Sequence, residues 1–268
     1  MYDIAHLKTL VRKRVELRVL IAILLAAAAI WAFVAIAGEV TEGDTQGLDE
    51  EILLMMRSPA DIREPYGPHW LEVLGRDLTA LGGTGILIMI TAFAALYMMM
   101  RGGLRTALVM VAAIASGFAA SQLLKWGFSR PRPDLVPHGT YVYTSSFPSG
   151  HSMMSAVVYL TLAILTARTE ALWRVRVFLI LSAVVLTVLV GISRVYLAVH
   201  WPSDVLAGWT IGAAWAIAWW FVARWVSEPA AGRGGEAVAA SDPAAGIEET
   251  RAPETEADRI AEADRPAR

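Results

Sequence analysis

The sequence predicts an all-α, polytopic membrane protein with six transmembrane helices, and three observations support this fold class. Hydrophobic residues make up 56% of the 268 residues and the mean hydropathy is +0.50, which is more apolar than an ordinary soluble domain. Six apolar segments approach the roughly 20 residues that cross a bilayer as a helix. They cover residues 19–37, 78–100, 106–124, 151–167, 177–193 and 205–224. Lys and Arg are concentrated in alternate connections between these segments, as in multi-pass membrane proteins.

The composition also argues against disulfides, thiolate metal sites and nucleic-acid binding. The chain has no cysteine, which excludes a disulfide framework and a thiolate metal site. It has no dense basic stripe with interleaved aromatic residues, so nothing indicates a nucleic-acid partner.

The first segment, 19–37, allows two interpretations. Basic residues precede it, and Ala35-Ile36-Ala37 resembles a signal-peptide cleavage site. Its 19 apolar residues exceed the roughly 7–15 of a signal core. We therefore expect a membrane helix, with a cleaved signal peptide as the alternative.

The remaining segments are expected to be helices of a single bundle. Segments 151–167 and 177–193 are short for a span and become long enough if the polar residues beside them continue the helices. Gly208 and Gly212 form a G-x-x-x-G pattern in the last segment. Such a pattern brings two helices close together, and we expect contact within one chain rather than a dimer. The oligomeric state stays open.

Lys and Arg in the short loops predict the orientation of the spans. One side collects the basic residues Lys8, Arg12, Lys13, Arg14, Arg18, Arg101, Arg105, Arg168, Arg174 and Arg176. The loop 38–77 on the other side has ten acidic residues and three arginines. We therefore expect a multi-pass protein of the cell (inner) membrane with both termini cytoplasmic.

Two further segments complete the predicted organisation. The outer loop contains LDEEILLMMR, in which Leu48, Ile52, Met55 and Met56 have helical spacing. This indicates an amphipathic helix that lies on the outer surface or caps the bundle. Residues 1–227 form the predicted membrane domain. Residues 228–268, rich in Ala, Gly, Pro and Glu, are predicted to be a disordered, acidic cytoplasmic tail.

Four cations break the orientation pattern. Lys125, Arg130, Arg132 and Arg194 lie at the outer ends of segments 106–124 and 177–193. Cations at membrane depth are costly unless an anion meets them. A phosphate is the simplest anion, because arginine binds its oxygens with a planar fork and lysine with a point charge.

Two histidines lie on the same predicted side as these cations. Ser149, Gly150 and His151 begin a membrane helix, where unpaired backbone N–H groups favour an anion and His151 can donate a proton. His200 has Asp204 four residues later, and a carboxylate on one imidazole nitrogen leaves the other free to attack. The chain must bend between Arg194 and Asp204, but its path there is not predicted.

Three groups of residues carry a resemblance to a known family. They are Lys125-x6-Arg132-Pro133, Pro148-Ser149-Gly150-His151 and Ser193-Arg194-x5-His200-x3-Asp204. In order and spacing they resemble the complete signature of the type 2 phosphatidic acid phosphatase superfamily. This family includes membrane lipid phosphatases, bacterial acid phosphatases and vanadium haloperoxidases.

The resemblance implies a role for each matching residue. His200 would be the nucleophile that forms a phosphohistidine, Asp204 would orient it, and His151 would protonate the leaving group. The phosphate would be held by Lys125, Arg132, Ser149, Gly150 and Arg194. The resemblance to the phosphatases of this family implies that no metal is needed, and no cofactor is expected. Arg130 lies outside the signature, and we expect it to contact the surface or a lipid headgroup.

These observations together predict a metal-independent phosphatase for lipid phosphates or diphosphates, with its active site on the outer face of the membrane. Candidate substrates are undecaprenyl diphosphate, phosphatidate, phosphatidylglycerophosphate and a lipid A phosphate. One alternative is a lipid phosphotransferase on the same scaffold. Another is a non-enzymatic transporter or scaffold, which gives no reason for two imidazoles and three cations together. Haloperoxidase activity gives no reason for a membrane location.

Aromatic and histidine residues outside the signature have simpler interpretations. Trp126 and Trp201 are expected at the outer membrane interface, where tryptophan is common. His6, His69 and His138 match no motif, and we interpret them as surface residues.

Overall fold

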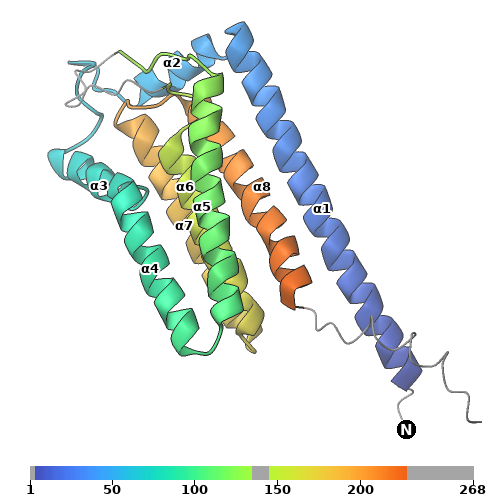
Figure 1. The fold of residues 1–268 in the computed structure, drawn as a ribbon. Coiled ribbons are helices and arrows are strands. Elements are labelled where there is room, and N and C mark those ends of the chain that lie inside the picture. Colours follow the sequence, from blue (N-terminus) through green and yellow to red (C-terminus); the bar gives the residue numbers. More distant parts are fainter. Residues whose placement is uncertain (1–3, 135–144, 228–268) are drawn as a thin grey trace, which may run out of the picture. The chain divides into compact units, whose positions relative to one another are not determined.

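In a computed structural model of the protein, the backbone is described for residues 4–134 and 145–227, and the side chains for residues 16–134 and 145–226. All regular secondary structure in these ranges is helical, which confirms the predicted fold class. The helices (Figure 1) are α1 (Ile4–Glu42), α2 (Gln46–Met55), α3 (His69–Ala80), α4 (Thr84–Met100), α5 (Leu104–Gly127), α6 (Gly150–Thr169), α7 (Trp173–Tyr196) and α8 (Pro202–Ser227).

Five of the described helices, α1, α5, α6, α7 and α8, are each long and apolar enough to cross a membrane. The pair α3 and α4 meets the same criteria together, although it is bent by 51°. The structure therefore has up to six spans when this bent pair is counted as one. Helices α6 and α7 reach 20 and 24 residues, because they include the polar residues that flank the predicted segments.

The second apolar segment, 78–100, is not the single helix that its composition predicts. Helix α3 ends at Ala80 and α4 begins at Thr84. The hydroxyl of Tyr159 in α6 donates a hydrogen bond to the Leu81 carbonyl at 2.8 Å. A Cβ atom on Gly82 would lie only 2.5 Å from Cγ1 of Val190 in α7. The break is therefore held by close contact with α6 and α7, which hydropathy alone does not reveal.

Helix α6 forms the centre of the bundle, and most of its residues from Ser152 to Ala167 are buried. It packs against α4, α5, α7 and α8. A Cβ atom on Gly208 would lie 2.8 Å from the Ser149 carbonyl, and one on Gly212 would lie 2.7 Å from the Met153 carbonyl. The G-x-x-x-G pattern thus brings α8 against α6, which confirms the expected contact within one chain.

Large apolar side chains cover the outside of the bundle. Trp31 in α1, Phe93 in α4 and Phe178 in α7 are 73%, 65% and 67% exposed. Outward-facing apolar side chains of this size suit a lipid environment.

Helix α2 has one buried and one exposed face. Asp49 and Leu53 are buried, and Leu53 packs with Ala198 of the α7–α8 link. Leu48 and Met55 are instead 62% and 68% exposed. The helix therefore packs on the end of the bundle and presents apolar side chains outward.

The chain bends between α7 and α8. Helix α7 ends at Tyr196, and α8 begins at Pro202. Ala198, in the link, has a φ of 52°, which lies in the left-handed region and is uncommon for a residue other than glycine. This link provides the bend that the spacing from Arg194 to Asp204 requires.

Several expectations concern other parts of the chain. The predicted tail, 228–268, and His138 lie outside the described residues, as does the side chain of His6. His69 begins α3 with an exposed side chain that lies 3.5 Å from Glu72, as expected of a surface residue.

Candidate active site

The three signature groups meet at one end of the helix bundle. Lys125 lies in the last turn of α5 and Gly150 begins α6, while His200 lies in the link that precedes α8. Figure 1 shows the starts of α6 and α8 on the side of α2, away from the turn between α4 and α5. Residues far apart in the sequence are therefore neighbours at this end.

The two ring nitrogens of His200 have different surroundings. Its side chain is buried, and Nδ1 lies 3.3 Å from Oδ2 of Asp204 and 3.2 Å from Oγ of Ser146. Nε2 lies 3.2 Å from Nη1 of Arg132. Because a guanidinium can only donate, Nε2 must accept and the proton must be on Nδ1. Burial lowers the pKa of His200 to about 3, so the imidazole is neutral near pH 7 and Nε2 can act as a nucleophile.

Asp204 is completely buried, and donors surround its carboxylate. Oδ1 accepts a hydrogen bond from Nη1 of Arg130 at 2.8 Å. Oδ2 accepts from the Ser146 hydroxyl and from the backbone N–H of Trp201 at 3.0 Å. This environment favours the ionised carboxylate, which then accepts the Nδ1 proton of His200.

Three predicted phosphate-binding cations lie around the pair of His200 and Asp204. Arg132 also donates to the Val199 carbonyl at 3.0 Å, and burial lowers its pKa. Arg194 donates to the Thr79 hydroxyl at 2.8 Å. Lys125 lies within electrostatic reach of both arginines. Like charges at this depth repel one another, so an anion that enters between them relieves a cost already present in the protein.

Arg194 has a donor without a partner. Its Nε atom is buried and has no hydrogen-bond partner in the described part of the chain. An unsatisfied buried donor is costly. A ligand oxygen that accepted this hydrogen bond would remove the cost.

The charges of the buried cluster favour a doubly charged anion. Within the described residues, four cations face two carboxylates. The cations are Lys125, Arg130, Arg132 and Arg194, and the carboxylates are Asp49 and Asp204. Two positive charges therefore remain, which matches the charge of about −1.5 to −2 on a phosphate monoester near pH 7.

His151 lies in the first turn of α6 and is half-buried. It lies within electrostatic reach of Arg194 and His200. A Cβ atom on Gly82 would lie 3.2 Å from Cβ and 3.3 Å from Cδ2 of His151. The link between α3 and α4 thus forms one wall of the site, directly beside this imidazole.

The start of α6 is fixed by Ser149. Its buried Oγ accepts from the backbone N–H of Ser152 at 3.4 Å and from the Ser152 hydroxyl at 3.0 Å. Its backbone N–H donates to the Asp204 carbonyl at 3.0 Å. A Cβ atom on Gly150 would lie 3.3 Å from Cε of Lys125, so glycine allows the lysine to lie against the helix start. Contact of Ser149 or Gly150 with a phosphate stays a prediction.

The expected surface position of Arg130 is wrong. Its side chain is only 9% exposed and forms ion pairs with Asp204 at 2.8 Å and Asp49 at 2.6 Å. The physical reason is that the segment after α5 turns back into the bundle, where the Arg130 carbonyl accepts from the Ser146 N–H at 3.0 Å.

The two tryptophans differ from each other. Trp126 is 83% exposed at the end of α5, which suits an interface. Trp201 is only 6% exposed, so its expected interface position is wrong. Its indole N–H donates to the Pro131 carbonyl at 3.0 Å, and the Arg130 guanidinium lies 5.6 Å from its ring centroid.

Sequence reasoning missed three polar residues of the site. Ser146 contacts both members of the His200–Asp204 pair, Thr79 contacts Arg194, and Asp49 contacts Arg130. None of the three leaves a clear signal in the sequence, because the neighbouring Glu50 and Glu51 also have an apolar residue four positions later and are exposed.

Comparisons with known proteins agree with this geometry. The model of the PAP2 superfamily matches residues 106–228, a range that contains every predicted site residue. The chain is 32% identical over 181 residues to phosphatidylglycerophosphatase B of Bacillus subtilis (strain 168), covering 67% of this chain and 85% of that protein. It is 31% identical over 141 residues to the undecaprenyl-diphosphatase of Sulfolobus acidocaldarius, covering 51% of this chain and 63% of that protein.

A solved structure shows the same likeness. It is the transmembrane PAP2 type phosphatidylglycerolphosphate phosphatase from Bacillus subtilis, with a TM-score of 0.66 and 27% sequence identity. The match covers 76% of this chain and 98% of that one.

Proposed function

We propose, from the premise that this chain belongs to the PAP2 superfamily, that it removes phosphate from lipid phosphates or diphosphates through a phosphohistidine on the outer face of the membrane. The chain is a membrane-embedded lipid phosphatase of this family. The intermediate, the substrate and the face of the membrane are the proposal.

The observation that carries the proposal is the position of His200 Nε2. This unprotonated nitrogen lies 3.2 Å from the Arg132 guanidinium. The cations around it exceed the neighbouring carboxylates by two charges. A phosphate held by Arg132, Arg194 and Lys125 would have its phosphorus beside the only ring nitrogen of His200 that has a lone pair. Positioning and charge stabilisation of this kind are the main needs of phosphoryl transfer.

The reaction follows from these positions. Nε2 of His200 attacks phosphorus, the bond from phosphorus to the leaving oxygen breaks, and His151 donates a proton to that oxygen. Asp204 stabilises the positive charge that develops on the imidazole. Water then attacks the phosphohistidine, His151 accepts the water proton, and inorganic phosphate leaves with His200 restored.

No metal is assigned a role in this mechanism. In the described ranges, no three His, Asp or Glu side chains converge as ligands would. The cations of the site supply the charge stabilisation instead.

Two features support a lipid substrate. The site lies at the ends of membrane helices, where an amphiphile can present its headgroup while its chains stay in the bilayer. An apolar groove of about 290 Å³ lies between α3 and α7, lined by Leu74, Leu78, Leu189 and Ile192 among others. Its lining also includes Ser193, the neighbour of Arg194. The names of the relatives agree with this class of substrate.

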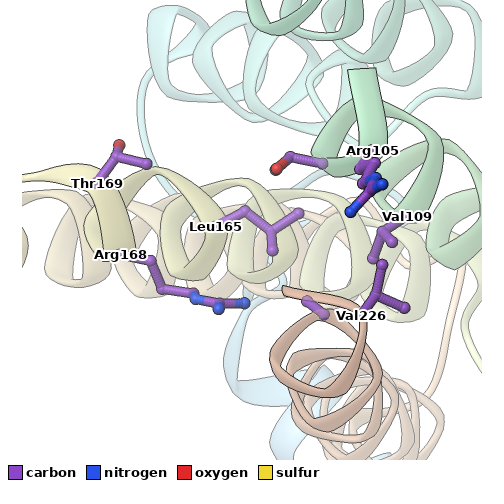
Figure 2. Close-up of a pocket in the computed structure, with 8 residues that line it drawn as sticks. Arg105, Val109, Leu165, Arg168, Thr169 and Val226 are labelled. Carbon is purple, nitrogen blue, oxygen red and sulfur yellow. The ribbon is translucent and has the colours of Figure 1, made fainter. Parts of the chain in front are cut away.

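The opposite end of the bundle supports the proposed orientation. Figure 2 shows Arg105 of α5 and Arg168 of α6 around a pocket between the start of α5 and the ends of α6 and α8. Basic residues at this end favour a cytoplasmic location, which would place His200 outside. Because the chain has no cysteine, single cysteines at exposed Ala60 and Thr169 test this orientation. An impermeant thiol reagent applied to intact cells should label Ala60→Cys and not Thr169→Cys, and the reverse result would overturn the orientation.

The decisive experiment is phosphate release by the purified protein. A panel should include phosphatidate, phosphatidylglycerophosphate, undecaprenyl diphosphate and a lipid A phosphate, with the lipid products identified. We expect inorganic phosphate in proportion to dephosphorylated lipid. Phosphate that appears instead on a second lipid would show a phosphotransferase, and no turnover of any lipid would refute the proposal.

A further inference from the structure

An ion-pair chain connects the outer loop to the orienting carboxylate of the nucleophile. Oδ2 of Asp49 in α2 lies 2.6 Å from Nη2 of Arg130, and Nη1 of Arg130 lies 2.8 Å from Oδ1 of Asp204. The side-chain exposures of Asp49, Arg130 and Asp204 are 3%, 9% and 0%. All three side chains of this ion-pair series are therefore buried.

The same acidic residue also fixes the start of α8. Oδ1 of Asp49 accepts the backbone N–H of Ser203 at 2.9 Å, and Oδ2 accepts the Ser203 hydroxyl. A carboxylate on the free N–H groups of a helix start is stabilising. Nη1 of Arg130 donates to the Ser203 hydroxyl at 2.6 Å, and Nη2 donates to Oγ1 of Thr45 at 3.1 Å. Because Asp204 directly follows Ser203, both its backbone and its side chain are held by this network.

We propose that Arg130 and Asp49 are positioning residues, which hold Asp204 in the ionised form and orientation that keep the lone pair of His200 on Nε2. This inference rests on the proposed function, because it acts through the predicted nucleophile. Neither residue contacts the substrate. Arg130 separates two buried carboxylates, and Asp49 aligns the guanidinium between α2 and α8.

The geometry predicts an unequal effect of the two residues. Without Arg130, two buried carboxylates face each other with no cation between them, and ionising both becomes costly. A proton on Oδ1 of Asp204 would remove the negative charge of this group and weaken the hydrogen bond that Oδ2 accepts from Nδ1 of His200. Without the charge of Asp49, a neutral pair of Arg130 and Asp204 remains. Loss of Asp49 should therefore be milder, and it should partly relieve the loss of Arg130.

A merely structural role would give a different pattern. If these ion pairs only held α2 against the bundle, their loss would lower thermal stability and the fraction of active enzyme. It would not lower turnover per folded molecule while phosphate binding stayed intact. Lys125, Arg132 and Arg194 are unaltered in these variants, so inhibition by inorganic phosphate reports whether the binding cations remain in place.

The test compares Arg130→Gln, Asp49→Asn and the double variant with wild type in detergent micelles. Glu51→Gln, an exposed position of α2, and Arg63→Gln, an exposed position of the same loop, are matched controls. The measurements are kcat and KM on a lipid phosphate, inhibition by inorganic phosphate and thermal unfolding.

For Arg130→Gln, kcat should fall on the order of 10²-fold, a part of the roughly 10⁴-fold loss that follows removal of an orienting carboxylate. KM and phosphate inhibition should change by less than about threefold, since ground-state binding is kept. Asp49→Asn should lose roughly tenfold in kcat, and the double variant should be more active than Arg130→Gln. The controls should match wild type.

Three results would overturn the inference. The first is an unchanged kcat in both single variants. The second is a double variant whose fold-loss in kcat equals the product of the two single losses. The third is inhibition by phosphate that weakens in step with kcat. If Arg130→Gln does not fold, Asp49→Asn decides through its kcat. In a folded Arg130→Ala variant, added guanidinium should restore turnover while urea should not. A wild-type protein that hydrolyses no lipid phosphate would refute the proposed function itself, whereas an active wild type with equally active variants refutes this inference alone.

Discussion

Replacement of Asp204 by asparagine should stop turnover while leaving phosphate binding nearly intact. The carboxylate accepts from Arg130 on Oδ1, and on Oδ2 from the Ser146 hydroxyl, the Trp201 N–H and Nδ1 of His200. An asparagine offers one acceptor oxygen and one NH2 group at the same places. Because the guanidinium cannot accept a hydrogen bond, the oxygen should face Arg130 and the NH2 group should face His200.

The magnitude follows from the tautomer of His200. An NH2 group beside Nδ1 makes this nitrogen an acceptor, which moves the proton to Nε2 and removes the lone pair that attacks phosphorus. The same change in a serine protease triad costs about 10⁴-fold in kcat, and we expect a loss of that order. The NH2 group also opposes the Trp201 N–H, so the free energy of unfolding should fall by about 1–3 kcal/mol for the unsatisfied donors.

The assay separates these two effects. Steady-state kinetics on a lipid phosphate should show the loss in kcat, with KM and inhibition by inorganic phosphate changed by less than about threefold. Thermal unfolding reports the stability loss. Asp77→Asn, at an exposed carboxylate of α3, is the control and should match wild type. A kcat of Asp204→Asn within tenfold of wild type would refute the assignment of the Nδ1–H tautomer and of Asp204 as its orienting group.

Further variants and inhibitors test the remaining roles. His200→Ala should abolish turnover on every substrate. His151→Ala should lose on the order of 10²–10⁴-fold in turnover of a lipid phosphate and less on p-nitrophenyl phosphate, whose leaving group needs no proton. Turnover of the aryl substrate by His200→Ala would show that the two roles are reversed. Turnover should survive EDTA and be inhibited by vanadate, which adopts the five-coordinate geometry of in-line transfer. If EDTA stopped turnover and a divalent ion restored it, the metal-free mechanism would be refuted. Gly82→Ala should lower kcat roughly tenfold, because its Cβ would meet Val190 and His151 and a 1 Å displacement can cost about 10²-fold. Gly85→Ala, with open space around its Cβ position, should not, and equal activity of the two would mean that this wall does not position His151.

Much of the site follows from sequence because its groups lie at helix ends. Lys125 lies in the last turn of α5 and His151 in the first turn of α6. In a membrane bundle, the end of one span and the start of the next lie on the same side. The pairing of His200 with Asp204 follows from a separation of four residues. The surroundings of Arg130 could not be predicted in this way. Its partner Asp49 is 81 residues away, and only folding of the segment before α3 onto the bundle brings the two together.

The error in the second apolar segment has a related cause. Hydropathy measures the affinity of a segment for lipid, and Leu81, Gly82 and Gly83 continue the apolar run without interruption. The direction of the chain at this point depends instead on contacts with Tyr159 and Val190. Two consecutive glycines were the available signal, because they allow a close approach that a straight helix does not need. This same departure from a straight span provides the wall beside His151.

The position of Asp49 beside Arg130 and the break at Gly82 indicate that residues before the region matched by the family model complete the site. The match to the PAP2 superfamily begins at residue 106, whereas Asp49 and Gly82 lie before it. Thr79 lies there too and accepts a hydrogen bond from Arg194. The matched region thus supplies the groups expected to react with phosphate, while α2 and the bent pair of α3 and α4, which precede it, lie around them. Differences in this preceding region between related enzymes are therefore expected to change how the lipid enters and how firmly Asp204 is held, with the reacting groups themselves unchanged.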